Sequence, residues 1–429
     1  MIQILDKRKC CGCSACSSIC PKRCIQMVED EEGFLYPQVD EAVCVDCGLC
    51  EKVCNELQPY KTRKPLKVLA AINMNDAIRQ KSSSGGIFYS IAEKVISGGG
   101  VVFGARFDDN WQVVIDYSEN LNGVEAFMGS KYVQARIESA YKDVKQFLQK
   151  GRLVLFSGTP CQVAGLYKFL QKEYDNLLTL DFICHGTPSP KVWRMYLDEV
   201  LDNIKFIKNI SFRNKIYGWR HLHFSVDYDE KGNSISLLNS AHKNQYMKAF
   251  LADLILRPSC SYCAVKSFSS QSDITLADFW GIWNVNPEMN DDKGTTMLFI
   301  NTKKGLDALP DDGLVKYAES SYETAIKYNK ACEVSVAPNP KRQIFFKQLK
   351  DTQSVTFLID NTLKRPFRLR TRDGIKYLIN RILRGGDDKR YYDKLFYINN
   401  PSIGSISFRN KEEGWRGYKF EIVISDTKA

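Results

Sequence analysis

Eight cysteines near the start of the chain form two runs with the same spacing. The first run is Cys10-x2-Cys13-x2-Cys16-x3-Cys20, and Pro21 follows it. The second run repeats the spacing with Cys44, Cys47, Cys50 and Cys54. Thiolates at these intervals bind [4Fe–4S] clusters, which transfer single electrons. The sequence therefore predicts a domain of the bacterial two-cluster ferredoxin type over residues 1–57.

The expected ligation is crossed between the two runs. The first three cysteines of a run wrap one cluster, and the fourth binds the other cluster. One cluster is expected to take Cys10, Cys13, Cys16 and Cys54. The other is expected to take Cys44, Cys47, Cys50 and Cys20. Zinc sites and disulfides are the alternatives, but a zinc site usually has four ligands with a long spacer.

Three residues near the runs depart from the pattern. Asn55 stands where the second run would repeat the Pro, which leaves the direction of the chain after Cys54 open. Cys11 and Cys24 fall outside the spacing and are interpreted as bystanders.

Length and composition indicate a multidomain redox protein of the cytoplasm. A chain of 429 residues with 44% hydrophobic residues is long and apolar enough for two or three domains. It has no apolar run of about 18 residues, so no transmembrane segment is expected. The first residues, MIQILDKRKCC, lack the apolar region of a secretory signal. Fifteen cysteines then favour metal binding in a reducing cytoplasm over disulfides.

The net charge of +10 suits an anionic partner. A phosphorylated cofactor, an acidic electron-carrier protein and a membrane surface all fit this description. The excess is concentrated in residues 364–390. No nucleic-acid-binding motif accompanies it, so no nucleic-acid partner is expected, and the stretch is interpreted as a solvated or docking face.

The expected fold class is α+β, with the cluster module followed by an α/β core that has a β-rich extension. Residues 58–67 contain two Pro and four basic residues and are interpreted as a linker. The core is divided into an N-terminal part, 68–200, and a C-terminal part with a CxxC motif, 201–340. Residues 341–429 form a basic extension.

Short apolar segments alternate with helical patterns in the first part of the core. Helices are expected after residue 86, where apolar residues recur at helical spacing until Gly98, and over 162–171. Strands are expected at 68–73, 101–107, 153–158 and 177–184.

One segment of the core recurs at the C-terminus. ISFRNKIYGWRHLHF (210–224) returns as ISFRNKEEGWRGYKF (406–420), with nine of the first eleven positions identical. Two equivalent β-hairpins are one interpretation. A duplication that adds nothing to function is favoured, because two copies are too few for a repeat architecture.

Four further cysteines have positions that suggest a common site. Cys161 and Cys184 each follow a predicted strand, and Cys260 and Cys263 form the CxxC. Because the ends of sequential strands in an α/β sheet lie near each other, these thiols are candidates for a third cluster. Scattered buried cysteines are the alternative. Cys332 has no partner pattern and is interpreted as inert.

A nucleophilic cysteine is a competing interpretation of the same residues. A Cys at a strand-to-helix turn with a His nearby, here Cys161 and His185, can form a thiolate and its base. No acyl-transfer signature accompanies the pair, and no catalytic residue is assigned. The remaining histidines are interpreted as ordinary polar residues: His221, His223 and His242.

The serine-rich segment 82–86 opens a predicted helix. Free N–H groups at a helix start bind phosphate, and Gly allows close approach, although a plain helix cap has the same sequence. Lys131 and Tyr132 in GSKYVQ add a cation and a ring. Residues 272–281, SDITLADFWG, hold two acids and a Trp after the CxxC.

These motifs occur together and in the same order in a known family. They resemble the family of coenzyme F420 hydrogenase/dehydrogenase beta subunits, to which plant 7-hydroxymethyl chlorophyll a reductase is related. The motifs that carry the resemblance are SSSGG, GSKY, SGTPCQ, ICHG, the CxxC, LADFWG and DDKGTTMLFINT (291–302). The resemblance runs from about residue 66 to residue 340, and an N-terminal ferredoxin module is common in the family.

The resemblance implies an oxidoreductase core that binds FAD. It implies a [4Fe–4S] cluster held by Cys161, Cys184, Cys260 and Cys263. It also implies flavin contacts by Ser83, Ser84, Gly85, Gly86, Lys131 and Tyr132. F420 itself is not implied for every member of the family.

The predicted function is electron transfer between a ferredoxin-like carrier, the clusters and FAD. FAD would then exchange a hydride with a small-molecule substrate, or with an F420 or nicotinamide carrier. The absence of GxGxxG weakens the nicotinamide option. An electron-relay subunit that only connects a partner redox enzyme, docked through residues 364–390, is the first alternative. A cysteine-dependent transferase is the second.

Overall fold

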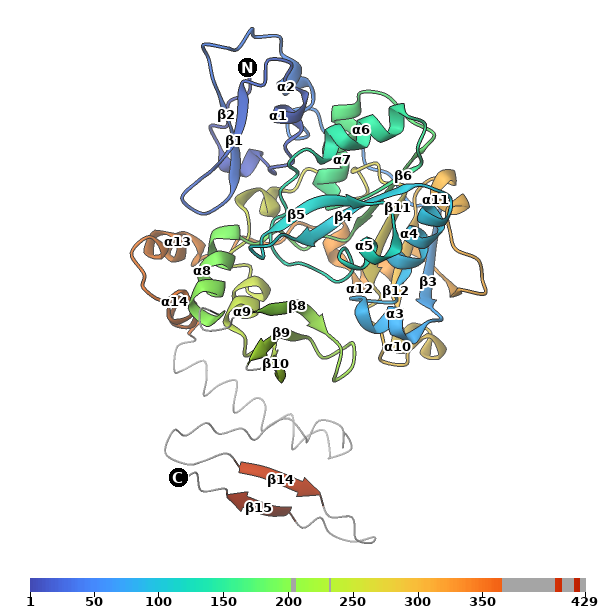
Figure 1. Cartoon of the computed structure of the whole chain (residues 1–429), viewed down its shortest axis with the longest axis vertical. Coiled ribbons are helices and arrows are strands. Elements are labelled where there is room, and N and C mark those ends of the chain that lie inside the picture. Colours follow the sequence, from blue (N-terminus) through green and yellow to red (C-terminus); the bar gives the residue numbers. More distant parts are fainter. Residues whose placement is uncertain (202–205, 231–232, 365–405, 411–419, 425–429) are drawn as a thin grey trace. The chain divides into compact units, whose positions relative to one another are not determined.

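The computed structural model describes residues 1–201, 206–230, 233–364, 406–410 and 420–424 (Figure 1). The chain divides into two compact units, Met1–Leu363 and Lys364–Ala429. Helices and several separate sheets make up the described residues, which confirms the predicted α+β class. No helix in this part of the chain is long and apolar enough to cross a membrane.

The N-terminal segment is built from two similar halves. One half contains α1 (Ala15–Ile19) and the other contains α2 (Leu49–Lys52). Each helix starts after a residue in the left-handed region, Ser14 with φ 59° and Gly48 with φ 71°, directly after the second cysteine of its run. The short helix η1 (Lys7–Lys9) precedes the first run, and the strands β1 (Ile25–Glu29) and β2 (Leu35–Val39) pair antiparallel between the runs.

An eight-stranded sheet with the order β13-β3-β12-β11-β7-β6-β4-β5 forms the centre of the first unit. Its strands are β3 (Lys67–Asn73), β4 (Val101–Phe107), β5 (Val113–Ser118), β6 (Val154–Ser157), β7 (Leu177–Phe182), β11 (Ile274–Asp278), β12 (Thr296–Ile300) and β13 (Val315–Ser320). Four neighbouring strands, β11-β7-β6-β4, run parallel. The four strands predicted from the sequence are confirmed to within two residues at each end.

Helices cover both faces of this sheet because its strands are apolar on both sides. In β4, Val102 packs toward α4 (Ile87–Ser97) and α5 (Leu121–Glu125). Phe103 packs toward α6 (Ala140–Gln149) and α7 (Pro160–Leu170) on the other face. The predicted helices correspond to α4 and α7. The second starts two residues earlier than predicted, because Pro160 occupies its first position and Thr159 caps it.

A second hydrophobic core lies beside the sheet and contains many aromatic residues, including the fully buried Trp193. It is formed by α8 (Pro190–Leu201), α9 (Gln245–Leu251), α13 (Arg342–Leu349), α14 (Val355–Leu363) and a three-stranded sheet. The strands of that sheet are β8 (Ile207–Asn214), β9 (His223–Glu230) and β10 (Asn233–Ser240), in the order β10-β9-β8.

The remaining elements are short. They are α3 (Asp76–Lys81), η2 (Pro258–Tyr262), α10 (Ile282–Val285), η3 (Pro287–Met289), α11 (Lys303–Asp307), α12 (Tyr322–Tyr328) and η4 (Lys330–Cys332). Residues 341–363 pack with the first unit through α13 and α14.

The repeated segment forms strands in both copies. In the first copy β8 pairs antiparallel with β9, and in the second copy β14 (Ile406–Asn410) pairs antiparallel with β15 (Phe420–Ile424). Both copies thus start an antiparallel pair of strands, but the pairs differ in register, because Ser211 pairs with Ser225 whereas the equivalent Ser407 pairs with Val423. That the second copy is a duplication without function stays a prediction. Residues 411–419, between β14 and β15, and the basic stretch beyond Lys364 lie outside the described residues.

Candidate redox site

The N-terminal cysteines lie in two groups around two cavities. The first cavity is lined by Cys10, Cys13, Cys16 and Cys54, together with Cys11. The second is lined by Cys20, Cys44, Cys47 and Cys50, together with Cys24. These are the two sets that the crossed assignment groups together, and their ligation of clusters stays a prediction. The Sγ atoms of Cys20 and Cys24 are 3.4 Å apart, so Cys24 is a direct neighbour of the second set.

The arrangement of these thiols suits clusters better than single ions. Among the described residues, no three His, Cys, Asp or Glu side chains are close enough to share one metal ion. A [4Fe–4S] cluster does not require that geometry, because each of its four thiolates binds a different iron atom. Each cavity has one complete set of four predicted ligands among the five cysteines that line it, which fits the cluster that the spacing predicts.

Two core cysteines follow adjacent parallel strands. β6 and β7 pair in parallel, so their carboxyl ends lie at the same edge of the sheet. Cys161 follows β6 and lies in the first turn of α7. Thr159 caps this helix, and its N–H donates to Gln162 Oε1 at 2.9 Å. The start of a helix favours negative charge, which suits a thiolate at Cys161. Cys184 follows β7.

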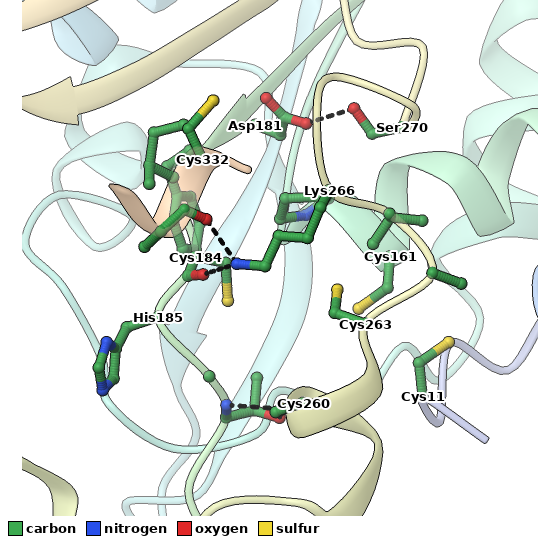
Figure 2. Close-up of a pocket in the computed structure, with 18 of the residues that line it drawn as sticks. Cys11, Cys161, Asp181, Cys184, His185, Cys260, Cys263, Lys266, Ser270 and Cys332 are labelled. Carbon is green, nitrogen blue, oxygen red and sulfur yellow. Dashed lines mark hydrogen bonds between the residues drawn. The ribbon is translucent and has the colours of Figure 1, made fainter. Parts of the chain in front are cut away.

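The CxxC motif reaches the same place through the loop after β7. The Arg257 N–H donates to the Thr187 carbonyl oxygen at 2.9 Å, which joins the start of η2 to that loop. The Thr187 N–H donates to Cys260 Sγ at 3.3 Å. As a result one cavity is lined by all four predicted core cysteines, Cys161, Cys184, Cys260 and Cys263 (Figure 2).

The wall of this cavity carries a cation and a buried carboxylate. Lys266 Nζ donates to the carbonyl oxygens of Cys184 at 2.9 Å and Ala331 at 2.6 Å, beside the thiols (Figure 2). Asp181 accepts hydrogen bonds from Ser270 Oγ at 2.6 Å and Thr275 Oγ1 at 2.5 Å. Burial raises the pKa of Asp181 to about 6. Charged groups held this way orient and tune a bound cluster.

Two cysteines that sequence reasoning left without a role also line this cavity. Cys11, interpreted as a bystander, lies against Cys161, and Cys332, interpreted as inert, is buried in the opposite part of the wall (Figure 2). No spacing rule would have placed either residue here, because both positions depend on contacts between distant segments.

The geometry does not favour Cys161 as a free nucleophile. The hydrogen bond with Cys11, followed by burial, raises the pKa of the Cys161 thiol well above its usual value. This shift disfavours a free thiolate nucleophile, whereas binding to iron would itself remove the proton from the thiol. His185, the suggested base, has its Nε2 atom 2.5 Å from Asp253 Oδ1. Its imidazole is therefore engaged with a carboxylate.

The structure brings the predicted flavin motifs together. Ser83 Oγ accepts hydrogen bonds from Ser130 N at 2.6 Å and Ser130 Oγ at 2.9 Å, which joins SSSGG to GSKY. The Gly85 N–H donates to Thr296 Oγ1 at 2.9 Å, which joins SSSGG to the segment DDKGTT. Gly86, with φ 86°, then starts α4 without a side-chain cap.

Lys131 and Tyr132 contact the protein itself in this structure. Lys131 Nζ donates to the carbonyl oxygens of Ala126 at 2.7 Å and Met128 at 2.8 Å, and burial lowers its pKa to about 7. The Tyr132 ring stacks on Phe250 with 4.4 Å between ring centroids. Their roles toward a flavin stay predictions.

The first copy of the repeated segment supplies buried cations behind SSSGG, which sequence reasoning did not anticipate. Lys215 Nζ donates to the Ser84 carbonyl oxygen at 3.0 Å, and burial lowers its pKa to about 7. Arg213 pairs with Asp278 at 2.5 Å and interacts with Tyr132. Arg213 Nη2 and Arg79 Nε are buried without hydrogen-bond partners. Both guanidinium groups already have a carboxylate partner, because Arg79 donates two hydrogen bonds of 2.7 Å to Asp291.

Replacement of Gly85 by Ala is expected to disrupt the flavin motif without affecting the clusters. A Cβ at this position would lie 2.5 Å from the Ala71 carbonyl oxygen and 2.8 Å from Thr296 N, so the loop must move. We expect Gly85→Ala to retain less than about a tenth of the wild-type FAD after gel filtration, a loss of about 1.4 kcal/mol in binding, with unchanged iron.

The matched control is Gly98→Ala at the other end of α4, where a Cβ has no contact closer than 3.5 Å. Wild-type FAD content in Gly85→Ala would show that this loop does not hold the flavin.

Part of the core is similar to a known family of proteins. Residues 151–321 match the family model that describes the C terminus of the beta subunit in coenzyme F420 hydrogenase/dehydrogenase. The F subunit of the F(420)H(2) dehydrogenase from Methanosarcina mazei is 21% identical over 169 residues, which are 37% of this chain and 48% of the relative. An uncharacterized protein of Methanocaldococcus jannaschii is 24% identical over 207 residues, 41% of this chain and 56% of the relative.

A further relative corresponds to a shorter segment. An uncharacterized ferredoxin of Methanocaldococcus jannaschii is 37% identical over 51 residues, 12% of this chain and 65% of the ferredoxin. The chain thus spans less than two thirds of each of these curated relatives.

Among solved structures, one chain of the F420-reducing [NiFe] hydrogenase complex from Methanosarcina barkeri is 18% identical to this chain, with a TM-score of 0.42. The comparison covers 78% of this chain and 99% of that chain. The resemblance predicted from the order of the motifs is confirmed for residues 151–321, which match the C terminus of the coenzyme F420 hydrogenase/dehydrogenase beta subunit.

Proposed function

We propose that this chain is an iron–sulfur flavoprotein oxidoreductase that passes electrons between a ferredoxin-like carrier and a two-electron acceptor. The observation that carries the proposal is the gathering of twelve cysteines into three groups of four around three cavities of one compact unit. [4Fe–4S] clusters would supply one-electron steps there, and FAD would supply a hydride or electron-pair step.

The residues of the core cavity would hold and tune the third cluster. Cys161, Cys184, Cys260 and Cys263 would be its ligands. The start of α7 and the Lys266 ammonium supply positive potential on two sides of the thiols. The hydrogen bond from the Thr187 N–H to Cys260 Sγ also favours the negatively charged thiolate.

The serine loop would bind the flavin. Ser83, Ser84, Gly85 and Gly86 lead directly into α4, whose N-cap is Gly86, so the N–H groups of the first turn of the helix would face a phosphate. Lys131 and Tyr132 would also contact the flavin after giving up their present contacts, which are carbonyl oxygens for Lys131 and the Phe250 ring for Tyr132. Conversion between one-electron and two-electron carriers would then take place within this chain, with F420 or a nicotinamide as candidate acceptors.

An electron-relay subunit is the second candidate. One relative is named as part of an F(420)H(2) dehydrogenase, and this chain spans about half of its length. A chain that only connects a partner enzyme would need the clusters but no substrate pocket of its own. The cysteine-dependent transferase has no comparable support, because the Cys161 thiol is buried and hydrogen-bonded to Cys11.

Anaerobic reduction of the purified chain distinguishes these candidates. Reduced ferredoxin is added as the one-electron donor, and absorbance follows the clusters, the flavin and added F420 or nicotinamide. We expect bleaching of bound flavin and repeated reduction of one added acceptor. Reduction of the clusters without turnover of any acceptor would favour the relay role, and a chain without flavin would contradict the proposal.

A further inference from the structure

One wall separates the first N-terminal cavity from the core cavity. Cys11, Asn55 and Glu56 line both cavities. Asn55 Nδ2 donates to the Cys161 carbonyl oxygen at 3.1 Å and contacts Cys13 Sγ at 3.8 Å. The second N-terminal cavity, in contrast, shares no lining residue with the core cavity. The first cysteine set is therefore the immediate neighbour of the core set.

The same neighbours are packed tightly against each other at α7. A Cβ on Gly165 would lie 3.0 Å from Cys13 Cβ and 3.1 Å from Cys13 Sγ. The helix α7, which has Cys161 in its first turn, therefore touches Cys13 directly, because Gly165 has no side chain there. The second set lies farther out, and its Cys47 is exposed.

A buried arginine lies at this junction. Arg257 is 1% exposed, and its Nη2 atom lies 3.6 Å from Cys10 Sγ. Its Nε donates to the Cys10 carbonyl oxygen at 2.7 Å, and its Nη1 donates to Gln134 Oε1 at 3.0 Å. Its carbonyl oxygen accepts from the Cys260 N–H at 3.0 Å. The guanidinium is thus fixed beside the first cysteine set, and its backbone is fixed beside the core set.

No carboxylate neutralises this guanidinium by a hydrogen bond within the described residues. Its acceptors are carbonyl oxygens, an amide oxygen and the Cys10 sulfur. In the same part of the chain, no side chain of Lys or Arg donates a hydrogen bond to a sulfur of the second set. The second cavity is lined by the Met1 ammonium and Lys22, but Met1 pairs with Asp46 at 2.8 Å and Lys22 is exposed to solvent. A buried guanidinium without a carboxylate partner therefore acts on the first site more strongly than these paired or screened cations act on the second.

We propose that Arg257 gives the first N-terminal cluster a more positive reduction potential than the second, so that electrons entering near Cys47 run toward the core. This inference rests on the proposed function. A reduced cluster carries one more negative charge, and a buried cation with a hydrogen bond to its thiolate stabilises that state. In the step itself the second cluster loses one electron and the first gains it, and no proton is transferred.

Redox titration followed by electron paramagnetic resonance tests the inference with Arg257→Met. We expect the ratio of reduced to oxidised first cluster at a given potential to fall about tenfold, a shift of about 59 mV to more negative potential. The potential of the second cluster is expected to stay unchanged. The core cluster is expected to shift in the same direction by a smaller amount, because the charge of Arg257 also acts on Cys161 and Cys260. Cys47→Ser alters the second cluster alone and so identifies which signal belongs to it.

Two further variants complete the test. Arg257→Lys keeps a cation but loses the fixed guanidinium donors, and we expect a smaller shift of the first-cluster potential in the same direction. This variant also replaces Arg257→Met in the test if Arg257→Met does not fold. Arg342→Met is the matched control, because Arg342 is a partly buried arginine, 13% exposed, that joins the core to the N-terminal segment through Glu32 at 3.0 Å and has no hydrogen bond to a cysteine sulfur among the described residues.

The outcomes separate this inference from the proposed function. An unchanged first-cluster potential in both Arg257 variants, or equal shifts of both N-terminal clusters, would overturn the role of Arg257 and leave the proposed function intact. A wild-type chain without N-terminal iron would overturn both. Iron analysis before each titration distinguishes these results.

Discussion

Replacement of Cys161 by Ser is expected to remove one cluster and leave two. The wild-type chain is expected to hold about twelve iron atoms, and Cys161→Ser about eight, because one [4Fe–4S] cluster contains four. Cys161 lies in the first turn of α7, in the cavity that it shares with Cys184, Cys260 and Cys263. A serine oxygen is a poor substitute for a soft thiolate at iron.

The variant is also expected to interrupt electron transfer. The N-terminal cysteine sets do not depend on Cys161 for their own grouping, so their clusters should still be reduced. Bound flavin should then no longer bleach when reduced ferredoxin is added. Iron content by inductively coupled plasma analysis and flavin absorbance measure both effects on one sample.

Cys332→Ser is the matched control for this experiment. Cys332 is buried in the wall of the same cavity but is outside the predicted ligand set. We expect about twelve iron atoms in this variant. Loss of activity in Cys161→Ser with iron unchanged would contradict ligation and revive the nucleophile interpretation.

Replacement of Gly165 by Val is expected to separate the N-terminal segment from the core. A Cβ at this position would lie 2.8 Å from the Tyr141 hydroxyl oxygen and 3.0 Å from Cys13 Cβ. Overpacking of this kind costs about 1–3 kcal/mol. If that energy is released by displacement of the N-terminal segment, the population in close contact falls about tenfold to a hundredfold.

The expected result of Gly165→Val is therefore slow transfer with intact centres. Stopped-flow reduction should show the N-terminal clusters reduced at the wild-type rate and the flavin reduced at least about tenfold more slowly. Gly313→Val is the matched control, because a Cβ there has no neighbour within 4 Å. Wild-type flavin reduction in Gly165→Val would show that electrons do not cross at α7.

Features that depend on local sequence were predictable. Strands such as β4 and β6 are continuous apolar segments bounded by Gly or polar residues, and the structure has them where the pattern indicates. The grouping of Cys161 with Cys184 follows from the geometry of parallel strands, because β6 and β7 are adjacent. The CxxC pair required the family resemblance, since its position depends on the contact between η2 and the loop after β7.

Features that depend on distant contacts were not predictable. Nothing around Arg257 in the sequence indicates that its guanidinium lies beside Cys10, 247 positions away. Asn55 was noticed only as a missing Pro, but its side chain connects the two cysteine sets. The repeated segment was noticed for its identity, whereas the burial of Arg213 and Lys215 beside Asp278 and Ser84 required the packed structure.

The central claim is that three clusters and one flavin are held in this chain, and anaerobic cofactor analysis tests it most directly. Protein purified without oxygen is analysed for iron, acid-labile sulfide and extracted flavin. We expect about twelve iron atoms and about twelve sulfides per chain, given four of each per cluster, with one FAD. About eight iron atoms and no flavin would contradict the claim and leave a two-cluster ferredoxin segment joined to a core of other function.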